Sequence, residues 1–457
     1  MDKTTEILSN YACDLSYDHL PPEVIQQVKR TLVDTFGCAM GGYLSEPAKI
    51  ARRLASEISS TSPSRIIGTE DYSSMDLAGF ANGVMVRYLD CNDSYFSPGG
   101  GHPSDMIPAA LAVADTLHST GKEFITAIVL AYEVFCRLSD QVEVSHLGWD
   151  QGCFSVIGAA CAAGKMMGLD QNQMANTISL SLAPNLPLRV TRTGELSMWK
   201  GCATASATRA AIFAAQLASD GMTGPGEPFD GPSGLCQLAL GGQSITPNVM
   251  GSQNEPFRII NTTVKNYPSQ IHTQAPIGLA LELQPKVNIA DIKSITIHSY
   301  NNAVSSPSDA PEKWAPKTRE SADHSIPFTV AAALRDGQVT PTTFTSNSIS
   351  DPNLVKIIEK ITIKENPDFT LRYSDEYNCH MEIITHSGQS FVAKTSFPKG
   401  HRNNPLNNAE LDTKFCKLSI PIIISSTPAS NIVVAISAVR CDALVGIATS
   451  SMPLSLR

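Results

Sequence analysis

The sequence predicts a mostly α-helical protein with a smaller α+β domain in its second half. Apolar residues recur at helical spacing through the first half, whereas strand-like segments and a hairpin signal occur only after about residue 261. A polar, proline-containing segment at 401–408 then separates the α+β region from the C-terminal residues. The expected units are a helical domain at 1–260, an α+β domain at 261–400 and a C-terminal segment at 401–457 that returns to the helical domain.

Proline and glycine mark the ends of several predicted helices in the first half. Pro21-Pro22 stand at the start of one helix, where the missing N–H of proline costs little, and Gly41-Gly42 follow it. Gly221 follows the last helix of this half, as is typical of a helix end. The predicted helices cover 22–36, 75–89, 122–138, 155–167 and 199–217, and another begins at Met106.

The α+β region contains strand, hairpin and helix signals. Its composition predicts a strand at Ser294–Ile297, and two more strands, Met381–Ile384 and Phe391–Lys394, flank a His-Ser-Gly-Gln turn. A helix is predicted at Ser321–Arg335.

The C-terminal residues are unusual because none is charged between Leu418 and Val439. Ile422–Ile424 and Ile432–Val434 favour strands on propensity. We expect this segment to be buried against the helical domain.

The composition excludes several classes of partner and compartment. A net charge of −9 argues against nucleic acid or an anionic membrane as a partner. The N-terminal residues lack a signal-peptide core, and no run of 18 apolar residues occurs. The eleven cysteines are scattered without a C-x-x-C pair, which is typical of free thiols in a reducing compartment. The sequence therefore predicts a cytoplasmic protein that binds neither nucleic acid nor membrane.

The common cofactor and metal motifs are missing from the sequence. It contains no G-x-G-x-x-G after a strand, no G-x-x-x-x-G-K-[ST], no G-x-S-x-G and no H-E-x-x-H. Closely spaced cysteines that would bind zinc or an iron–sulfur cluster are also absent. These absences argue against dinucleotide, P-loop, zinc and iron–sulfur sites, so side chains should carry any dehydration of a hydroxy acid.

A loop at 89–108 places acid and base groups between two predicted helices. Its Gly99–Gly101 run gives the backbone freedom, and catalytic groups are often found on such loops. Ser104 or Asp105 is expected to cap the helix that follows. The alternative interpretation is a solvated loop without a catalytic role. The titratable residues of the loop are Asp90, Asp93, Asp105 and His102.

Two further clusters carry cationic groups. Arg192 and Lys200 lie just before a predicted helix, and their guanidinium and ammonium groups suit a carboxylate ligand. The alternative is a solvated basic loop. Lys265, Tyr267 and His272 lie at the boundary between the two predicted domains, where ligand pockets are often found.

These clusters, in this order and spacing, resemble the MmgE/PrpD family over nearly the whole chain. The most specific segments are LDCNDSYFSPGGGHPSD, SMWKGCATASATRAAIFAAQLASDGMTGP, VKNYPSQIHTQ and ADHSIPF. The resemblance implies a large all-helical domain built from both chain ends, a smaller α+β lid domain and a homodimer. It also implies catalysis on a small di- or tricarboxylate without metal or organic cofactor.

The resemblance also assigns site residues. Ser94 stands where relatives often have threonine. His272 lies two residues before the histidine of the decarboxylase-like pattern, where this chain has Gln274, and this departure favours the dehydratase branch. His324 is added because it begins a predicted helix, where a neutral imidazole is favoured. The expected catalytic residues are Asp90, His102, Lys200, Tyr267 and His272, and the expected substrate-binding residues are Ser94, Arg192, Lys265, Gln274 and His324.

The expected reaction is dehydration of a citrate-like hydroxy-tricarboxylate, with 2-methylcitrate converted to 2-methyl-cis-aconitate. The cationic side chains would hold the carboxylates and stabilise the enolate. His102 or Asp90 would take the proton, and His272 or Tyr267 would protonate the departing hydroxyl. The alternatives are decarboxylation of cis-aconitate, epimerisation or isomerisation of a small dicarboxylate, and carboxylate binding without catalysis.

Overall fold

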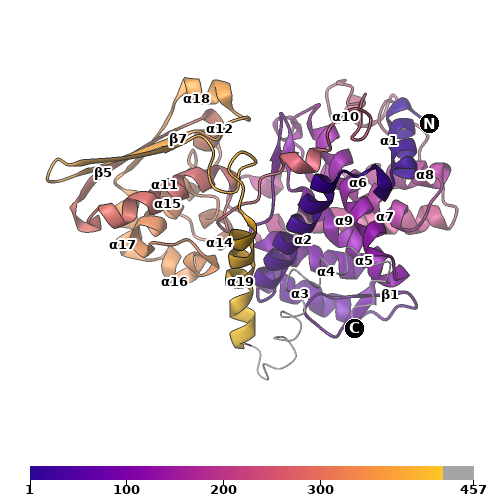
Figure 1. The fold of residues 1–457 in the computed structure, drawn as a ribbon, viewed down its shortest axis with the longest axis horizontal. Coiled ribbons are helices and arrows are strands. Elements are labelled where there is room, and N and C mark those ends of the chain that lie inside the picture. Colours follow the sequence, from indigo (N-terminus) through magenta and orange to yellow (C-terminus); the bar gives the residue numbers. More distant parts are fainter. Residues whose placement is uncertain (426–457) are drawn as a thin grey trace.

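The computed structural model describes residues 1–425 of the chain, and these residues form a mostly helical protein with a small mixed sheet in the C-terminal half. A large helical domain and a smaller sheet-containing domain lie side by side, and the last described helix, α19, runs down between them (Figure 1). The predicted fold class is confirmed. No helix among the described residues combines the length and apolar character needed to cross a bilayer.

The helical domain contains the predicted helices and also helices at 3–14, 46–56 and 171–182 that were not predicted, and the helix predicted at 22–36 continues to Gly42. Its core lies around α7, whose residues from Gly152 to Gly164 are all buried. Small residues permit this, because a Cβ on Gly158 would lie 2.5 Å from the sulfur of Met106. The helices are α1 Lys3–Asp14, α2 Pro22–Gly42, α3 Glu46–Ser56, α4 Met75–Tyr88, α5 Ile107–Leu117, α6 Gly121–Ser139, α7 Gly152–Met166, α8 Gln171–Leu182, α9 Ala203–Ser219 and α10 Leu235–Leu238. Two short hairpins pair β1 Pro63–Arg65 with β2 Tyr72–Ser74, and β3 Tyr95–Phe96 with β4 Gly100–Gly101.

Two local predictions in this domain are wrong. Neither Ser104 nor Asp105 caps α5, because Pro103–Met106 forms a 3-10 turn that leads directly into that helix. The Asp105 carboxylate instead accepts a hydrogen bond from Asn92 at 2.8 Å. The helix predicted to begin at Trp199 begins at Ala203, after a 3-10 turn at Met198–Gly201.

The smaller domain, called the lid domain below, is a four-stranded sheet with helices on one face. The strand order is β6-β5-β7-β8, in which β5 runs parallel to β6 and antiparallel to β7. Its own apolar core is separate from that of the helical domain. The strands are β5 Ile292–Ser299, β6 Ile361–Glu365, β7 Cys379–Thr385 and β8 Ser390–Thr395, and the longer helices are α11 Gln274–Leu283, α15 Ile326–Asp336 and α17 Pro352–Ile358.

The helix predicted at Ser321–Arg335 is broken in the structure. The short helix α14, Arg319–Ala322, ends before Asp323, and α15 begins only at Ile326. Ser325 ends the break because its hydroxyl caps α15 by accepting the N–H of Phe328 at 3.0 Å. The break turns Asp323 and His324 out of the helix and toward the site described below.

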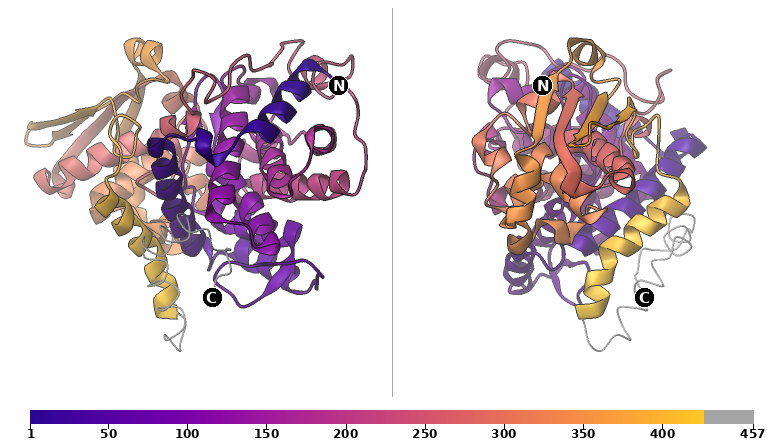
Figure 2. Two further views of the ribbon diagram at one scale, coloured as in Figure 1. Left: turned by 45° about the vertical axis from the view of Figure 1, so that its right-hand side comes forward. Right: turned by 90° about the vertical axis from the view of Figure 1, so that its left-hand side faces the viewer.

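The C-terminal helix α19, Asn408–Ser425, lies alongside α2 of the helical domain (Figure 2). Phe415 packs there with Val33, and a Cβ on Gly37 of α2 would lie 3.1 Å from the Phe415 ring. The strand favoured at Ile422–Ile424 is wrong, since these residues belong to α19. The strand favoured at Ile432–Val434 lies outside the described residues.

Two neighbouring chain segments join the domains. Thr263 exchanges backbone hydrogen bonds with Ser94 at 2.8 Å in both directions, and the next residue, Val264, donates its N–H to the carbonyl of Gly400 at 3.0 Å. Gly400 has a φ of +95°, and a Cβ there would lie 1.9 Å from the Val264 carbonyl oxygen. Only glycine fits at position 400, where the two segments that join the domains pack against each other.

Replacing Gly400 with alanine should destabilise the protein by at least about 1–3 kcal/mol, because the strained backbone and the collision with Val264 act together. Gly388→Ala is the matched control. Gly388 also has a positive φ, of +85°, but a Cβ there would meet nothing within 4 Å. Thermal unfolding of both variants checks the expectation, and equal losses of Tm would show that the close approach at Gly400 carries no cost.

Candidate active site

Asp90 is the centre of a buried cluster of charged side chains. Helix α4 ends at Tyr88, and Asp90 turns the chain with a left-handed φ of +52°. The Asp90 carboxylate accepts a hydrogen bond from Arg87, one turn earlier, and is only 1% exposed. Burial alone would raise the pKa of Asp90, but Arg87, Lys200 and Lys265 outweigh it and hold this pKa well below its usual value. Asp90 is therefore a carboxylate anion.

Two lysines from distant parts of the chain bind the Asp90 carboxylate. Lys200 donates to Oδ2 at 3.0 Å, while Lys265 donates to Oδ1 at 2.5 Å and to the Asp90 carbonyl at 2.8 Å. Both lysines are at most 1% exposed. Burial lowers the pKa of Lys200 to about 8 in spite of Asp323 and Asp90, and it lowers the pKa of Lys265 as well. These ammonium groups are held by carboxylates in a dry environment.

His102 faces Asp90 with one ring nitrogen and is fixed through the other. Its Nδ1 lies 2.7 Å from the Asp93 carbonyl oxygen and 3.1 Å from the Ser94 hydroxyl. A carbonyl oxygen can only accept, so Nδ1 carries the proton and Nε2 keeps its lone pair. Nε2 lies 3.7 Å from Asp90 Oδ1. Burial, with Arg87 and Lys265, lowers the pKa of His102 well below its usual value, so the free ring is neutral.

Asp93 braces the segment that carries His102. Its carboxylate accepts the N–H of Ser104 at 3.0 Å and the hydroxyl of Tyr132 at 2.8 Å. Burial raises the pKa of Asp93 to about 6. The glycine run serves the same segment by close packing, since a Cβ on Gly99 would lie 2.3 Å from the Val142 carbonyl. The loop is thus a packed structure, and its interpretation as a solvated loop does not describe it.

His324 and Asp323 reach the cluster from the break between α14 and α15. The His324 Nε2 atom lies 3.3 Å from Asp90 Oδ2, and its Nδ1 contacts Asp323. Arg319 pairs with the other Asp323 oxygen at 2.9 Å, and Lys200 lies 3.8 Å from the first. Burial and Lys200 lower the pKa of His324 to about 4, so this ring is neutral, as expected for its position.

His272 lies in an aromatic environment at the start of α11. Its Nδ1 is 2.7 Å from the Tyr300 hydroxyl, and its ring lies 5.8 Å from that of Tyr373 and 6.2 Å from that of Phe96. The Phe96 ring in turn lies 6.5 Å from His102, which connects the two histidines across the domain boundary. Burial and the nearby Lys265 ammonium lower the pKa of His272 to about 3.

Three predicted site residues have other partners in the structure. Arg192 pairs with the buried Asp150 at 2.7 Å and donates to the Lys200 carbonyl at 3.1 Å. Gln274 uses its side-chain amide to hold the backbone of 266–269. Tyr267 packs with the lid-domain core, and its hydroxyl lies 4.0 Å from a Cβ placed on Gly278. The geometry thus makes Arg192 and Gln274 braces for the loops that carry the two lysines, and it places the Tyr267 hydroxyl near α11.

Arg87 and Asp323 belong to the cluster but were not among the predicted site residues. In the sequence, Arg87 cannot be distinguished from any basic residue in the last turn of a helix. Only its spacing of three residues from Asp90 indicates that the two side chains form an ion pair. Asp323 immediately precedes His324 in the ADHSIPF segment, so that motif contained the signal.

One group of potential metal ligands occurs among the described residues: Asp90, Asp323 and His324 have ligand atoms within 4.8 Å of one another. Both carboxylates already contact the Lys200 ammonium, and Asp90 is also bound by Arg87 and Lys265. A divalent cation would have to displace these fixed positive charges. The donor set therefore fits an anionic ligand better than a metal ion.

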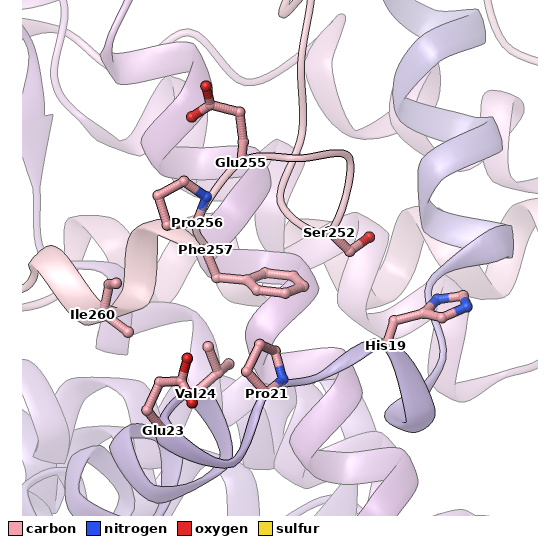
Figure 3. Close-up of a pocket in the computed structure, with 9 residues that line it drawn as sticks. All are labelled: His19, Pro21, Glu23, Val24, Ser252, Glu255, Pro256, Phe257 and Ile260. Atoms are coloured by element: carbon pink, nitrogen blue, oxygen red, sulfur yellow. The ribbon is translucent and has the colours of Figure 1, made fainter.

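The cluster is enclosed, since Lys200 is 1% and His102 7% exposed. An open pocket of about 450 Å³ lies elsewhere, between the start of α2 and the segment at 252–260 (Figure 3). It has an apolar floor at Phe257, and its carboxylates, Glu23 and Glu255, are unsuited to an anion. Asp90, Lys200 and His102 come from the helical domain, whereas His324 and His272 come from the lid domain, so both domains contribute to the site.

The fold and the site define a two-domain helical protein with a buried, cation-rich site between its domains. The model of the MmgE/PrpD N-terminal domain matches residues 6–248, and that of the MmgE/PrpD C-terminal domain matches residues 267–436. The chain belongs to the MmgE/PrpD family, a family of dehydratases and decarboxylases that act on small carboxylates. The predicted family is confirmed.

Curated relatives include both kinds of enzyme. The chain is 27% identical to 2-methylcitrate dehydratase of Escherichia coli K12 over 370 residues, which cover 75% of this chain and 74% of the relative. It is 26% identical to 2-methylcitrate dehydratase of Cupriavidus necator over 380 residues, 76% and 74% of the two chains. It is also 24% identical to human cis-aconitate decarboxylase over 437 residues, 90% and 86% of the two chains.

Proposed function

We propose that this protein is a cofactor-independent hydro-lyase that removes water from a citrate-like hydroxy-tricarboxylate, with 2-methylcitrate as the first candidate. The observation that supports this most is the convergence of Lys200, Lys265 and His102 on Asp90 in one buried site. Fixed cations in a water-excluded site stabilise the charge that develops when a proton leaves a carbon beside a carboxylate.

His102 is the proposed base. Its Nε2 has a free lone pair and lies 3.7 Å from Asp90 Oδ1, whereas the Asp90 carboxylate is bound by three cations that make it a weak base. In the proposed step, Nε2 takes the proton from carbon, the electron pair forms the alkene, and the C–O bond to the hydroxyl breaks. Binding of a trianion would raise the pKa of His102 and so favour this transfer.

His272 is the proposed acid for the departing hydroxyl. A positive charge on His272 would be repelled by the Lys265 ammonium in the free site, and a bound trianion would offset that repulsion. Tyr267 is less well placed, because its hydroxyl is turned toward α11. Ser94 supports the base through its contact with His102 Nδ1. His324 and the two lysines would contact the substrate carboxylates, and Arg192 and Gln274 would hold the loops around them.

A substrate screen in deuterated water followed by NMR tests the proposal. Purified protein is mixed separately with 2-methylcitrate, citrate, cis-aconitate and small hydroxy dicarboxylates. Hydro-lyase activity gives an alkene from a hydroxy acid. Loss of carbon dioxide from cis-aconitate would instead show a decarboxylase, exchange of the C–H alone would show an epimerase, and binding without turnover would show an inactive homologue. Any of these three outcomes without alkene formation contradicts the proposal.

The activity of the free enzyme should fall above about pH 8. The Lys200 pKa of about 8 means that the ammonium is present below this pH and is lost as the pH rises through it. Since the neutral amine cannot bind a carboxylate as an ion pair, kcat/KM should decline by about tenfold per pH unit above it. The pH profile of kcat/KM measures this. In Lys200→Arg the decline should disappear, and an unchanged alkaline limb in that variant would exclude Lys200 as its origin.

We further propose a homodimer located in the cytoplasm. The ten cysteines of the described part of the chain are all free thiols, which suits a reducing compartment. Light scattering of the purified protein measures the oligomeric state, and a monomer at micromolar concentration would contradict the proposed dimer.

A further inference from the structure

Lys414 of the C-terminal helix α19 reaches the turn that carries Asp90. Its side chain is 6% exposed, and its ammonium group pairs with Asp34 of α2 and donates to the carbonyl oxygen of Cys91 at 2.7 Å. Cys91 directly follows Asp90. A residue more than 300 positions later in the sequence therefore contacts the backbone beside the centre of the site.

Two successive carbonyls of this turn are held by buried ammonium groups. Lys265 donates to the carbonyl of Asp90 at 2.8 Å, and Lys414 donates to that of Cys91 at 2.7 Å. The turn needs such support because Asp90 has a φ of +52°, a region that L residues other than glycine rarely adopt. The direction of the Asp90 carboxylate depends on this turn, and so do the positions of Lys200 and His102 relative to it.

We propose that Lys414 is a positioning residue of the active site, acting through the Cys91 carbonyl to aim the Asp90 carboxylate. The expected loss of kcat rests on the proposed function. The expected change in the turn at Asp90 does not depend on it. Helix α19 thereby becomes part of the catalytic apparatus of the helical domain, in addition to packing on α2.

The contact with Asp34 suggests a simpler role for Lys414, which is to stabilise the fold through a buried ion pair. The experiment must distinguish this role from positioning of the Asp90 turn. Lys414 and Asp34 form a buried ion pair, and loss of one partner leaves an uncompensated buried charge that destabilises the protein. Replacing both partners with apolar residues removes that charge problem and is often neutral for stability. The bond to the Cys91 carbonyl, however, is lost in both cases.

The experiment therefore compares Lys414→Met with the double variant Asp34→Leu/Lys414→Met. The single variant should lose thermal stability, and the double variant should recover most of the wild-type Tm. Both should show a kcat lowered about 10- to 100-fold with a smaller change in KM, because small misplacements of catalytic groups have effects of this size. Lys417→Met, an exposed position on the same helix, is the matched control and should match the wild type in both measurements.

Recovery of wild-type kcat in the double variant would overturn the proposal, since Lys414 would then serve only the ion pair. A crystal structure of the double variant gives a readout that does not depend on turnover. The proposal predicts that Asp90 leaves its left-handed φ and that the distance from Lys265 Nζ to the Asp90 carbonyl lengthens. An unchanged turn would overturn the inference about Lys414 even if no substrate is found, whereas an altered turn in an enzyme without hydro-lyase activity would contradict the proposed function alone.

Discussion

Replacing His102 with asparagine is expected to lower kcat at least about 100-fold, because a positioned base contributes roughly 10²–10⁴-fold to proton transfer. Asparagine offers an amide N–H in place of the Nδ1 proton that contacts the Asp93 carbonyl at 2.7 Å. It cannot accept a proton from carbon. The variant therefore removes the proposed chemistry while keeping the most important local hydrogen bond.

Steady-state kinetics measures this effect, and thermal unfolding serves as the control for the fold. A Tm close to that of the wild type with a large loss of kcat and a small change in KM would identify an interaction that acts in the transition state. Turnover near the wild-type rate in a folded His102→Asn protein would show that another group takes the proton.

Replacing Lys200 with methionine is expected to lower kcat/KM by about 10²–10³-fold, through a lower kcat as well as a higher KM. Loss of one preorganised charge partner of an anion in a dry site has consequences of this size. Lys200 is 1% exposed and its ammonium lies 3.0 Å from Asp90 Oδ2, so no solvent replaces it. Methionine keeps much of the length and apolar stem of the side chain.

Lys200→Arg is the matched control for charge. It keeps a cation but changes its shape, and it should retain more kcat/KM than Lys200→Met. If Lys200→Met binds the substrate with an unchanged KM, Lys200 is not part of the carboxylate-binding group, and its contact with Asp90 is structural.

Hydrophobic periodicity was sufficient to predict most long helices. The segment predicted at 75–89 is α4, Met75–Tyr88, and that predicted at 122–138 is α6, Gly121–Ser139. Both helices are long and carry a continuous apolar pattern, so the local signal and the core agree. Short elements such as β6, Ile361–Glu365, were missed because few residues carry their signal.

Tertiary context explains the incorrect strand at Ile422–Ile424. The three isoleucines favour a strand by themselves, but they continue a helix that is anchored earlier by Phe415 and Lys414. Packing on α2 outweighs an intrinsic preference that spans about 1 kcal/mol. The helix predicted at Ser321–Arg335 shows the opposite error, because its apolar periodicity predicts one continuous helix. The Ser325 cap and the proline that follows it start a separate helix there.

The sequence located the loops of the candidate site better than it assigned their side chains. Residue type and order placed Asp90, His102 and the two lysines in the segments that converge. Spacing along the chain cannot reveal that Arg192 is already paired with Asp150, or that Gln274 is engaged by the backbone. Such pairings depend on side chains that meet only in the folded protein.

Turnover by metal-depleted protein tests most directly whether the side chains of the site catalyse the reaction without a metal. Wild-type enzyme is treated with a chelator, dialysed and mixed with 2-methylcitrate in deuterated water, and alkene formation is followed by NMR beside His102→Asn. If side chains alone carry the reaction, the wild type keeps its full rate after chelation and the variant is at least about 100-fold slower. Activity that is lost on chelation and restored by iron would contradict this expectation.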